Sequence, residues 1–590
     1  MDARATHQQR LGHWETQQAR RAAQDRAIAL ARVVTFSLAV AVLLGALFVR
    51  AYGLVWVLAP FGVFVVLVTI HGRVLDALTT AKDAVAFHAQ ALLRMDGTWE
   101  DNPMDGSRHL HGDHPYAADL DLFGPHSLFA LLWSGRTVLG EDTLATWLKA
   151  PAPPGTVRQR HDAVRELAVA MDHREALHLA SRGNLEPGRL RSWANAPAWN
   201  PPVWLRPVLF VLSAVTGVTL VLWWVDVLPL AVGSALCVLE AAVVMSLGAR
   251  TRGVLDTVAR RAEELQALSA RLALMERFPA RSTLLQKHLE DLKIDGVMPS
   301  AVVAALARKL AWADMRHNQV LFPVALALMW STQWALALES WRRQHGPRLG
   351  LWLHVAGSWE ALASLAAYHA EHPDDVFPEL LDAGPALEAT AVGHPLLPAR
   401  SCVRNDVSLG ASTRLLIISG SNMSGKSTYL RAVGCAVVMA LAGAPVRARS
   451  MRLGPTQLGA SMRVVDNLAG GKSRFAAEIA RLKLVVDLAG AAMPLLFLLD
   501  EILSGTNSHD RQIGAQGVVK GLLDKGAMGM ITTHDLALTR MAGELGDRAR
   551  NVHFQDTMKD GVLVFDFTLR DGVVDHSNAL ELMRAVGLGV

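Results

Sequence analysis

Cysteine is scarce in this chain of 590 residues, which contains only Cys237, Cys402 and Cys435. The three cysteines are far apart, odd in number and without the spacing of metal ligands, so they argue against a disulfide framework and against a zinc site. A large charge of one sign is also missing, because the formal net charge is only +4. Charge alone therefore gives no reason to expect a nucleic-acid-binding protein, and the low cysteine content favours a reducing compartment.

Charged residues are missing altogether from two long apolar runs near the N-terminus. The first run, "VVTFSLAVAVLLGALFV", covers Val33 to Val49, and the second, "AYGLVWVLAPFGVFVVLVTI", covers Ala51 to Ile70. A hydrocarbon core of about 30 Å is crossed by about 20 helical residues, with about 17 as the practical minimum. The two runs therefore predict a membrane hairpin. A cleaved signal peptide is disfavoured, because a long polar segment precedes the first run and a second run follows at once.

A second apolar pair covers Pro207 to Val225 and Val227 to Leu247, with only Asp226 between the two runs. Glu240 lies inside the second of these runs, where a carboxylate near mid-span costs about 2.5–3.5 kcal/mol on insertion scales. We expect this side chain to be protonated, to face a partner helix or to reach towards the interface. The pair predicts a second membrane hairpin. For both pairs, the alternative is two buried helices in the core of a soluble protein.

Basic residues flank both predicted hairpins on the side opposite to their turns, which contain only Arg50 and Asp226. The positive-inside bias then places both termini and the segment between the hairpins in the cytoplasm. We therefore expect a multi-pass protein of the cell (inner) membrane. The flanking basic residues are Arg4, Arg10, Arg20, Arg21, Arg26, Arg32, Arg73, Lys82, Arg250, Arg252, Arg260 and Arg261.

A third apolar run, Val320 to Leu338, contains three consecutive polar residues and an early proline. We expect a buried helix of a helical domain here in preference to a fifth span, which would move the C-terminal part of the chain across the membrane. Apolar residues recur at helical spacing among charges from Leu75 to Met95 and from Gly253 to Leu274. Such stripes predict packing helices, and we assign them no chemistry.

The stretch "LIISGSNMSGKSTYLRAVG" contains the phosphate-loop pattern, with a β-rich segment before it and a helical segment after it. Phosphate oxygens need several converging N–H donors, and a glycine-bearing turn that leads into a helix lets the backbone approach them closely. We expect Lys426 to reach the β and γ phosphates of ATP and the Ser427 hydroxyl to bind Mg²⁺. The expected ATP-binding residues of the loop are Gly420, Ser421, Asn422, Met423, Ser424, Gly425, Lys426, Ser427 and Thr428.

A second part of the same predicted site lies in "PLLFLLDEILSGTNSHDR", where an apolar run ends in two carboxylates. The run predicts a buried strand. Asp500 is then expected to hold Mg²⁺ through the water shell of the ion, and Glu501 to orient and polarise the attacking water. A third β-rich run, "MGMITTH", ends in His534. We expect this histidine to sense the γ-phosphate, although a lone histidine is more often structural.

These motifs resemble those of the MutS family of DNA mismatch-repair ATPases. In "GSNMSGKSTYLR", Asn422 and Met423 agree with the phosphate loop of that family, whereas Ser421 and Ser424 stand where the family typically has proline and glycine. The tail "LVFDFTLRDGVVDHSNALELMRAVGL" is similar to the strand, turn and helix that close the family's ATPase domain.

Two further segments carry the resemblance. In "LGASMRVVDNLAGGKSRFAAEI", Ser473 and Glu478 match the family's Ser-Thr-x-x-x-x-Glu signature, and Arg474 replaces the threonine. "DEILSGTNSHD" resembles the family's Asp-Glu-Ile-Gly-Arg-Gly-Thr run, with Leu503 and Ser504 in place of glycine and arginine. In the family, the signature serine reaches across a dimer to the ATP of the partner. The resemblance therefore implies that Ser473 binds ATP at a composite site and that the chain forms a homodimer through its ATPase domains.

The resemblance extends upstream to about Leu120. "DLFGPHSLFALLWSGRTVLGEDTLATWLKAPAPPGTVRQRHDAVREL" is similar to the start of the family's helical core, or lever, domain, and "GHPLLPARSCVRNDVSL" is similar to the segment that joins this core to the ATPase. The residues ahead of this region form a basic tail, a hairpin and a linker, which leaves no room for the domain with which mismatch-recognising members read DNA. Direct recognition of mismatches is therefore not expected.

Together these features predict an α/β P-loop NTPase domain of the ABC-type ATPase class, a mostly α-helical core/lever domain and two transmembrane helical hairpins. The resemblance implies a membrane-anchored MutS-like ATPase that uses ATP and Mg²⁺, moves its levers, and has DNA and the lipid bilayer as partners. The expected segments are a basic cytoplasmic tail (1–32), hairpin 1 (33–72), the first part of the lever domain (73–204), hairpin 2 (205–249), the second part of the lever domain (250–395) and the ATPase domain (396–590).

Two alternatives stay open at this point. An ABC-type membrane transporter shares the ATPase architecture, but the chain lacks a Leu-Ser-Gly-Gly-Gln signature and its interval between the phosphate loop and Asp500 is short. A membrane scaffold that binds nucleotide without hydrolysis is the other alternative. The presence of Lys426, Ser427 and Glu501 argues against it.

Overall fold

The chain forms two compact units. Unit 1 comprises residues 1–103 and 370–373, and unit 2 comprises residues 104–369 and 374–590. Unit 1 contains the first predicted hairpin, and unit 2 contains the second hairpin and the predicted nucleotide site. The computed structural model describes all residues except 1, 50–53, 100–103, 111–112, 182–186, 198, 259–260, 294–295, 316–327, 463–473, 504–506, 560–561 and 575–590.

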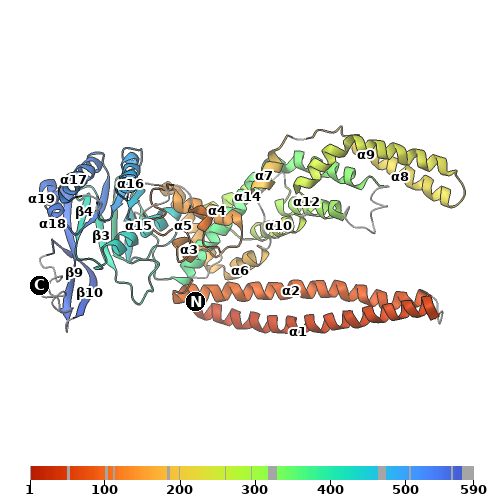
Figure 1. The fold of residues 1–590 in the computed structure, drawn as a ribbon, viewed down its shortest axis with the longest axis horizontal. Helices are drawn as coiled ribbons and strands as arrows, with labels where there is room; N and C mark the ends of the chain where they lie inside the picture. The colour runs from red at the N-terminus through yellow and green to blue at the C-terminus, as the bar shows by residue number, and fades with distance from the viewer. Residues whose placement is uncertain are drawn as a thin grey trace. The chain divides into compact units, whose positions relative to one another are not determined.

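Two long helices run side by side as a hairpin in unit 1 (Figure 1). Helix α1 covers Ala3–Leu44 and continues as a π-helical turn, Gly45–Val49; a 3-10 turn, Leu54–Val57, then leads into α2, Leu58–Asp96. At 1.5 Å per residue, the 42 residues of α1 span about 63 Å, roughly twice a hydrocarbon core. Residues 3–32 therefore belong to the same helix as the first apolar run, which differs from the separate tail expected over 1–32.

Polar contacts hold the two helices together in the half of hairpin 1 that lies outside the apolar runs. His7 and His88 are buried, with their Nδ1 atoms 2.9 Å apart. The His71 ring lies 2.6 Å from a carboxylate oxygen of Asp25 and also contacts the Arg32 guanidinium. Arg32 immediately precedes the first apolar run and His71 immediately follows the second, so this cluster marks the end of the polar half.

The other half of hairpin 1, residues 33–49 and 54–70, is what we call the apolar tip. Its large side chains face outwards: Leu38 is 54% exposed, Phe48 79% and Trp56 65%. Each of the two helices contains a stretch that is long and apolar enough to cross a membrane. Apolar surface exposed to this extent is rare on soluble monomers and marks contact with a membrane or a partner.

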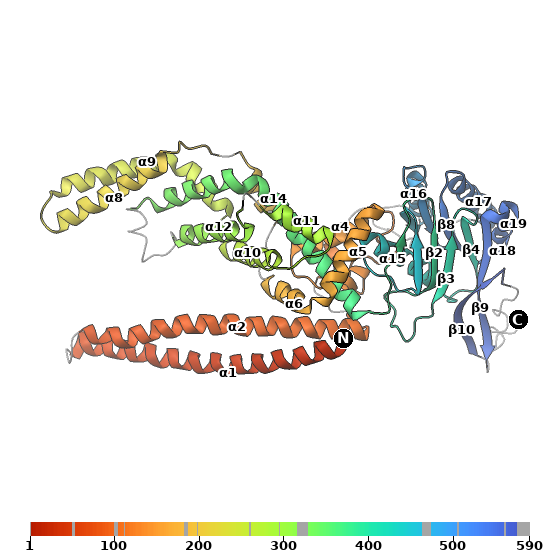
Figure 2. The same cartoon turned by 180° about the vertical axis from the view of Figure 1, so that it is seen from behind.

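A second hairpin lies in unit 2, where α8 (Leu205–Trp224) and α9 (Leu230–Val258) run side by side (Figure 2). These are the other two of the four helices in the described part of the chain that could cross a membrane by length and composition. Glu240 is only 4% exposed, so of the three possibilities that the sequence left open, burial of the side chain against protein is the one that agrees with the structure. Near the start of α8, Leu209 packs with Met329 and Leu336.

The long helix α14, Trp330–Glu371, begins inside the third apolar run. Residues 320–327 of that run lie outside the described residues. In the part that follows, Ala335 and Leu336 are 0% and 3% exposed, as expected for a buried helix. The expectation for the whole run stays a prediction.

Helices form the rest of the region ahead of the sheets, and Glu360 on α14 links three parts of it. Its buried carboxylate accepts backbone N–H groups from Arg136 at 2.7 Å and Thr137 at 3.1 Å, and lies 3.5 Å from the Arg271 guanidinium. These contacts tie α14 to two other helical segments. The helices are α3 (Leu128–Leu132), α4 (Val138–Lys149), α5 (Pro154–Val169), α6 (Met171–Ala180), α7 (Pro187–Asn195), α10 (Ala262–Glu276), α11 (Thr283–Leu292) and α12 (Pro299–Asp314), with a 3-10 turn at Ser107–His109.

A four-stranded sheet, the small sheet, has the strand order β1-β5-β2-β3. Its strands are β1 (Glu379–Leu380), β2 (Leu387–Val392), β3 (Asn405–Leu409) and β5 (Ser450–Leu453). Buried and exposed residues alternate along β3 and β5, so one face of the sheet is packed and the other is open. Because β5 pairs with both β1 and β2, the sheet begins well before residue 396, where the ATPase domain was expected to start.

The large sheet has the strand order β10-β9-β4-β8-β7-β6. Its neighbours pair in parallel, except that β9 and β10 are antiparallel. The strands are β4 (Leu415–Ser419), β6 (Gln457–Ser461), β7 (Leu495–Leu499), β8 (Met528–Thr533), β9 (Ala549–Lys559) and β10 (Val562–Asp571). The helices around it are α15 (Lys426–Ala442), α16 (Arg474–Leu488), α17 (Ser508–Asp524), α18 (Leu536–Thr539) and α19 (Met541–Leu545).

Helices cover both faces of the large sheet, which explains why β4 and β7 are buried along their whole length. On one face, Phe497 of β7 packs in a core with Val485 of α16 and Val519 of α17. On the other face, α15 lies so close to β7 that a Cβ on Gly434 would be 2.8 Å from Leu498. An α/β domain and a helical region are therefore present, as the sequence predicted.

Candidate active site

The phosphate-loop pattern lies between β4 and α15. Strand β4 pairs in parallel with β8 on one side and β9 on the other, so the loop leaves the middle of the large sheet. Its backbone is left-handed at Gly420 (φ 147°), Met423 (φ 67°) and Gly425 (φ 103°). A Cβ on Gly420 would lie 2.8 Å from the Phe554 carbonyl oxygen, so this position requires glycine. The chain thus turns directly from the strand into the N-terminus of α15, where backbone N–H groups are available to an anion.

Lys426 is the first residue of α15 and is only 5% exposed. Its Nζ donates to the carbonyl oxygens of Gly420 at 2.9 Å and Ser421 at 2.7 Å. Burial lowers the pKa of this ammonium group, and the negative charges of Glu501 and Asp500 oppose that shift. The lysine therefore lies against the predicted phosphate loop, within the field of Asp500, the predicted metal-holding carboxylate, and of Glu501, the predicted catalytic one.

The remaining predicted loop residues differ in their exposure. Ser424 is buried, and its hydroxyl donates to the Ser421 carbonyl oxygen at 2.8 Å, which closes the turn. Ser427 is half-buried, whereas Asn422, Met423 and Thr428 are exposed. The side chains of Asn422, Met423 and Thr428 are therefore accessible from solvent.

Asp500 and Glu501 directly follow β7, and Thr532 of the neighbouring β8 holds both. The Thr532 hydroxyl donates to the Asp500 Oδ1 atom and accepts the Glu501 backbone N–H at 3.0 Å. Thr532 is 0% exposed, so these contacts are shielded from water. Glu501 has a left-handed backbone, φ 47°, and its side chain is 38% exposed. The threonine thus fixes the Asp500 carboxylate while the Glu501 side chain stays accessible.

His534 follows β8, and its Nδ1 atom lies 3.6 Å from a carboxylate oxygen of Glu501. Strands β4, β8 and β7 are adjacent and parallel, so the segments that follow them meet at one edge of the sheet. Lys426, Asp500 and His534 come from those three segments. In α/β sheets, ligands bind at this carboxyl edge.

Ser473 lies outside the described residues, so its role in a composite site stays a prediction. Glu478, its partner in the sequence signature, is on α16 and is 3% exposed. The Glu478 Oε1 atom accepts the backbone N–H of Leu503, which has a left-handed backbone with φ 58°. Glu478 therefore holds the turn that follows Glu501, a role that the sequence pattern alone did not indicate.

A pocket of about 320 Å³ adjoins the phosphate loop and was missed by the sequence analysis. Phe567 forms part of its wall, and a Cβ on Gly425 would lie 3.1 Å from that ring. Phe567 has a left-handed backbone, φ 54°, where the pairing of β9 with β10 shifts register. The tail motif contained this residue, but nothing local marked it as part of a site. The other lining residues are Val392, His394, Leu397, Ser401, Val403, Asn405, Thr428, Tyr429, Ala432 and Phe554.

Asp119 connects the helical region to this edge of the sheet. Its carboxylate accepts the Met462 backbone N–H at 2.7 Å and also contacts the Arg481 guanidinium on α16. Asp119 is 1% exposed, so the contact is a buried one. Because Glu478 lies on the same helix, α16 links the helical region to the turn after Glu501.

Comparison with known proteins identifies a similarity in the C-terminal part of the chain. Residues 416–589 match the family model described as MutS domain V. "DNA mismatch repair protein MutS 1" of Halobacterium salinarum (strain ATCC 29341 / DSM 671 / R1) is 36% identical over 236 residues, which is 39% of this chain and 26% of that protein. "DNA mismatch repair protein MutS" of Lysinibacillus sphaericus (strain C3-41) is 35% identical over 211 residues, or 35% of this chain and 24% of that protein.

"DNA mismatch repair protein MutS 2" of Halobacterium salinarum (strain ATCC 700922 / JCM 11081 / NRC-1) is 35% identical over 237 residues. The matched region is only about a quarter of the length of these curated relatives. The family resemblance read from the motifs is therefore confirmed for the nucleotide-site domain.

Proposed function

Because residues 416–589 belong to the MutS domain V family, we propose that this chain is a membrane-anchored MutS-like ATPase. The observation that carries the proposal is the meeting of Lys426, Asp500 and His534 at the carboxyl edge of three adjacent parallel strands, with Glu501 beside them. ATP hydrolysis needs a cation for the phosphates, a carboxylate for a metal ion and a group that orients water. This edge of the sheet supplies all three.

ATP binding uses the backbone N–H groups at the start of α15 and the ammonium of Lys426. The lysine exchanges the carbonyl oxygens of Gly420 and Ser421 for the β and γ phosphates. The adenine base enters the apolar pocket beside Phe567, which adjoins the same loop. Burial of Lys426 strengthens its attraction to phosphate, because the charge acts in a site of low dielectric constant.

The residues present fit Mg²⁺, since this ion prefers hard oxygen ligands. The Ser427 hydroxyl would be one such ligand, and the Asp500 carboxylate, whose Oδ1 atom is held by Thr532, would hold the ion through its water shell. When bound, Mg²⁺ neutralises negative charge on the phosphates.

Hydrolysis is an in-line attack of water on the γ-phosphorus, in which the bond from that phosphorus to the β–γ bridging oxygen breaks. Glu501 accepts a hydrogen bond from the attacking water and orients it, and His534, 3.6 Å from Glu501, faces the γ-phosphate. Catalysis comes mainly from positioning and charge neutralisation. Glu478 supports it by fixing the Leu503 backbone in the turn after Glu501.

The family match and the names of the relatives support two proposed partners. We propose a homodimer formed through the ATPase domains, in which Ser473 of one chain completes the ATP site of the other. The curated relatives are named DNA mismatch repair proteins, and we propose DNA as a ligand of this chain. Binding of the chain to duplex, mismatched, branched and single-stranded DNA, with and without ATP and at several salt concentrations, measures that part of the proposal.

The four apolar helices support the anchor, which we place in the cell (inner) membrane with the ATPase and both termini in the cytoplasm. The exposed side chains of the apolar tip are compatible with lipid and costly in water. Extraction of the protein from membranes by alkali, without detergent, would contradict an integral anchor.

The decisive test of the ATPase proposal is Lys426→Ala. We expect this variant to lose ATP turnover, because the charge on the phosphates is no longer neutralised. The matched control is Lys520→Ala on α17, which removes an exposed lysine whose Nζ donates to Glu544 at 2.8 Å, and which should hydrolyse ATP at the normal rate. Turnover that survives Lys426→Ala would remove the assignment.

A further inference from the structure

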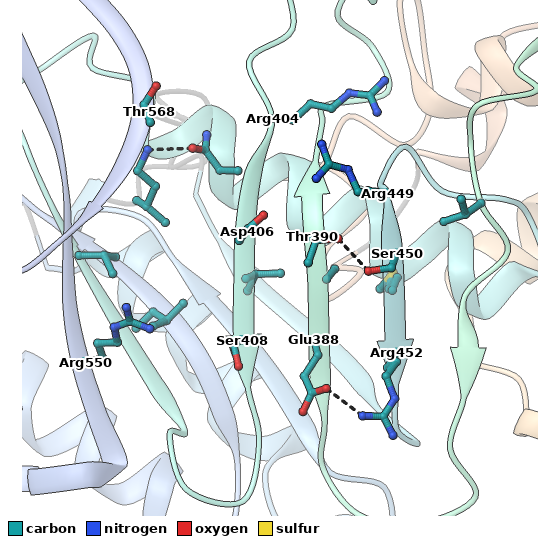
Figure 3. Close-up of a pocket in the computed structure, with 18 of the residues that line it drawn as sticks. Glu388, Thr390, Arg404, Asp406, Ser408, Arg449, Ser450, Arg452, Arg550 and Thr568 are labelled. Atoms are coloured by element: carbon teal, nitrogen blue, oxygen red, sulfur yellow. Dashed lines mark hydrogen bonds and ion pairs between the residues drawn. The ribbon is translucent and has the colours of Figure 1, made fainter.

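A large polar pocket of about 990 Å³ lies on the open face of the small sheet, where β9 and β10 of the large sheet adjoin it (Figure 3). We call it the basic groove, because arginine side chains from both sheets line it. It is separate from the phosphate loop, and none of the residues expected to bind ATP lines it. The charged residues that line it are Arg404, Arg449, Arg452, Arg550, Arg570, Glu379, Glu388, Asp406 and Asp571.

Three of the five arginines are neutralised by carboxylates. Arg452 lies 3.0 Å from Glu388 and 3.2 Å from Glu379. Arg550 is paired with Asp571, and Arg570 lies 2.6 Å from Asp566. Every carboxylate that lines the groove, except that of Asp406, takes part in one of these ion pairs. The part of the groove around these pairs therefore has no excess of positive charge to offer an anion.

The other two arginines, Arg404 and Arg449, make no ion pair within the described part of the chain. Figure 3 shows them together at one end of the groove, away from the Glu388–Arg452 pair. The nearby Asp406 carboxylate accepts the Ala391 backbone N–H at 2.7 Å and forms no ion pair with either arginine. Two like charges in a concave site attract an anion more strongly than the same charges on a flat surface.

Hydroxyl groups complete this end of the groove. Thr390 and Ser450 lie on neighbouring strands with their oxygens 2.7 Å apart, and Thr568 lies across the groove on β10. Guanidinium groups bind phosphate through paired N–H donors, and hydroxyl groups supply additional donors. The set matches phosphate better than it matches a monovalent carboxylate.

We propose that the basic groove binds a small ligand that carries two phosphate groups, held by Arg404 and Arg449. The volume lies at the upper end of the range of small-molecule sites, about 300–1,000 Å³, which suits a ligand of nucleotide size. The other end of the groove, where Arg452 faces both Glu388 and Glu379, has no positive charge in excess and then accommodates the part of the ligand that carries no phosphate.

The groove is connected to the nucleotide site through Asn405, the neighbour of Arg404. The Asn405 amide donates to the Phe567 carbonyl oxygen at 3.0 Å and accepts the Leu569 backbone N–H at 2.8 Å. It thereby fixes the irregular turn of β10 that places the Phe567 ring beside the phosphate loop. A ligand that orders Arg404 and Thr568 should stabilise this turn and tighten ATP binding, a consequence that rests on the proposed ATPase function.

The test is a count of binding sites for radiolabelled inorganic pyrophosphate on the full chain in detergent micelles, by equilibrium dialysis. We expect two sites on the unaltered chain, one at the phosphate loop and one in the groove. Lys426→Ala should remove only the first site. The double variant Arg404→Gln/Arg449→Gln should remove only the second, and its remaining site shows that the domain is folded.

The matched control is Arg452→Gln, which removes a neutralised arginine of the same groove and should leave two sites. A chain that loses all pyrophosphate binding with Lys426→Ala has no groove site, and the proposal is then overturned whether or not ATP is hydrolysed. Two sites remaining in the double variant would also overturn it. Displacement of the groove-bound pyrophosphate by a single-stranded oligonucleotide, and by no mononucleotide, would reassign the groove to nucleic acid and reject a small ligand.

Discussion

The Thr532 hydroxyl gives the sharpest test of how the carboxyl edge of the large sheet is built. Substitution of Thr532 by valine keeps the volume and removes the hydroxyl that holds Asp500 and Glu501. A hydrogen bond to a charged group contributes about 1.5–3 kcal/mol, and a buried N–H left without a partner costs about 1–3 kcal/mol. With partial rearrangement, we expect a loss of about 3 kcal/mol in the free energy of unfolding of this domain.

A loss of this size should lower the melting temperature by about 6–12 °C, since 1 kcal/mol shifts it by about 2–4 °C in a domain of 150–250 residues. Turnover of ATP should fall by about tenfold or more because Asp500 and Glu501 lose their shared anchor, whereas the KM for ATP should change little. Melting followed by tryptophan fluorescence and steady-state phosphate release measure the two effects.

Thr456→Val is the matched control for this substitution. Thr456 is also 0% exposed, but its hydroxyl has no hydrogen-bond partner among the described residues. Its replacement should leave the melting temperature unchanged or raise it, because no contact is lost. Equal melting temperatures for Thr532→Val and Thr456→Val would refute the anchoring role of Thr532.

Two further predictions concern the pocket beside the phosphate loop. Phe567→Ala should weaken ATP binding by about 1–3 kcal/mol, or about 5–150-fold, because the base loses a stacking surface. The same variant should bind pyrophosphate at the phosphate loop as before. Equal weakening of ATP and pyrophosphate binding would contradict a pocket for the base. Burial, with the charges of Arg431 and Arg447, lowers the pKa of His394 to about 4. This histidine therefore reduces the stability of the fold only at pH values where its ring is protonated in the unfolded chain. Stability should therefore be complete above about pH 6.5 and fall towards pH 4, and urea unfolding of His394→Gln should show a pH dependence smaller by about 3 kcal/mol over that window.

Local patterns in the sequence predicted the elements whose formation depends on near neighbours. Within the part of the chain that the structure describes, the apolar runs predicted all four helices that are long and apolar enough to cross a membrane, since the spacing of polar residues sets both length and solvent preference. They did not predict that α1 extends unbroken through the polar residues 3–32, because that half is stabilised by contacts with α2 such as that between His7 and His88.

The small sheet shows a similar limit. Residues 379–392 were expected to belong to the helical lever domain (250–395), because strands as short as β1 and β2 carry little sequence pattern of their own. Their place is set by pairing with β5, whose residues lie about 60 to 75 positions later along the chain. Residues 379–392 therefore belong structurally to the nucleotide-site domain.

The sequence by itself determined which residues are expected to bind phosphate and carry out hydrolysis: the spacing from Gly420 to Ser427 and the pair Asp500–Glu501 are short-range patterns that predict one consistent chemistry. Only the tertiary structure decided what holds those residues in place and what lies beside them. Thr532, Glu478 and Phe567 act on partners from other elements, and the arginines of the basic groove come from two sheets. The physical reason is that a hydrogen bond or a pocket wall depends on distance in space, which strand order and register set and which spacing along the chain does not encode.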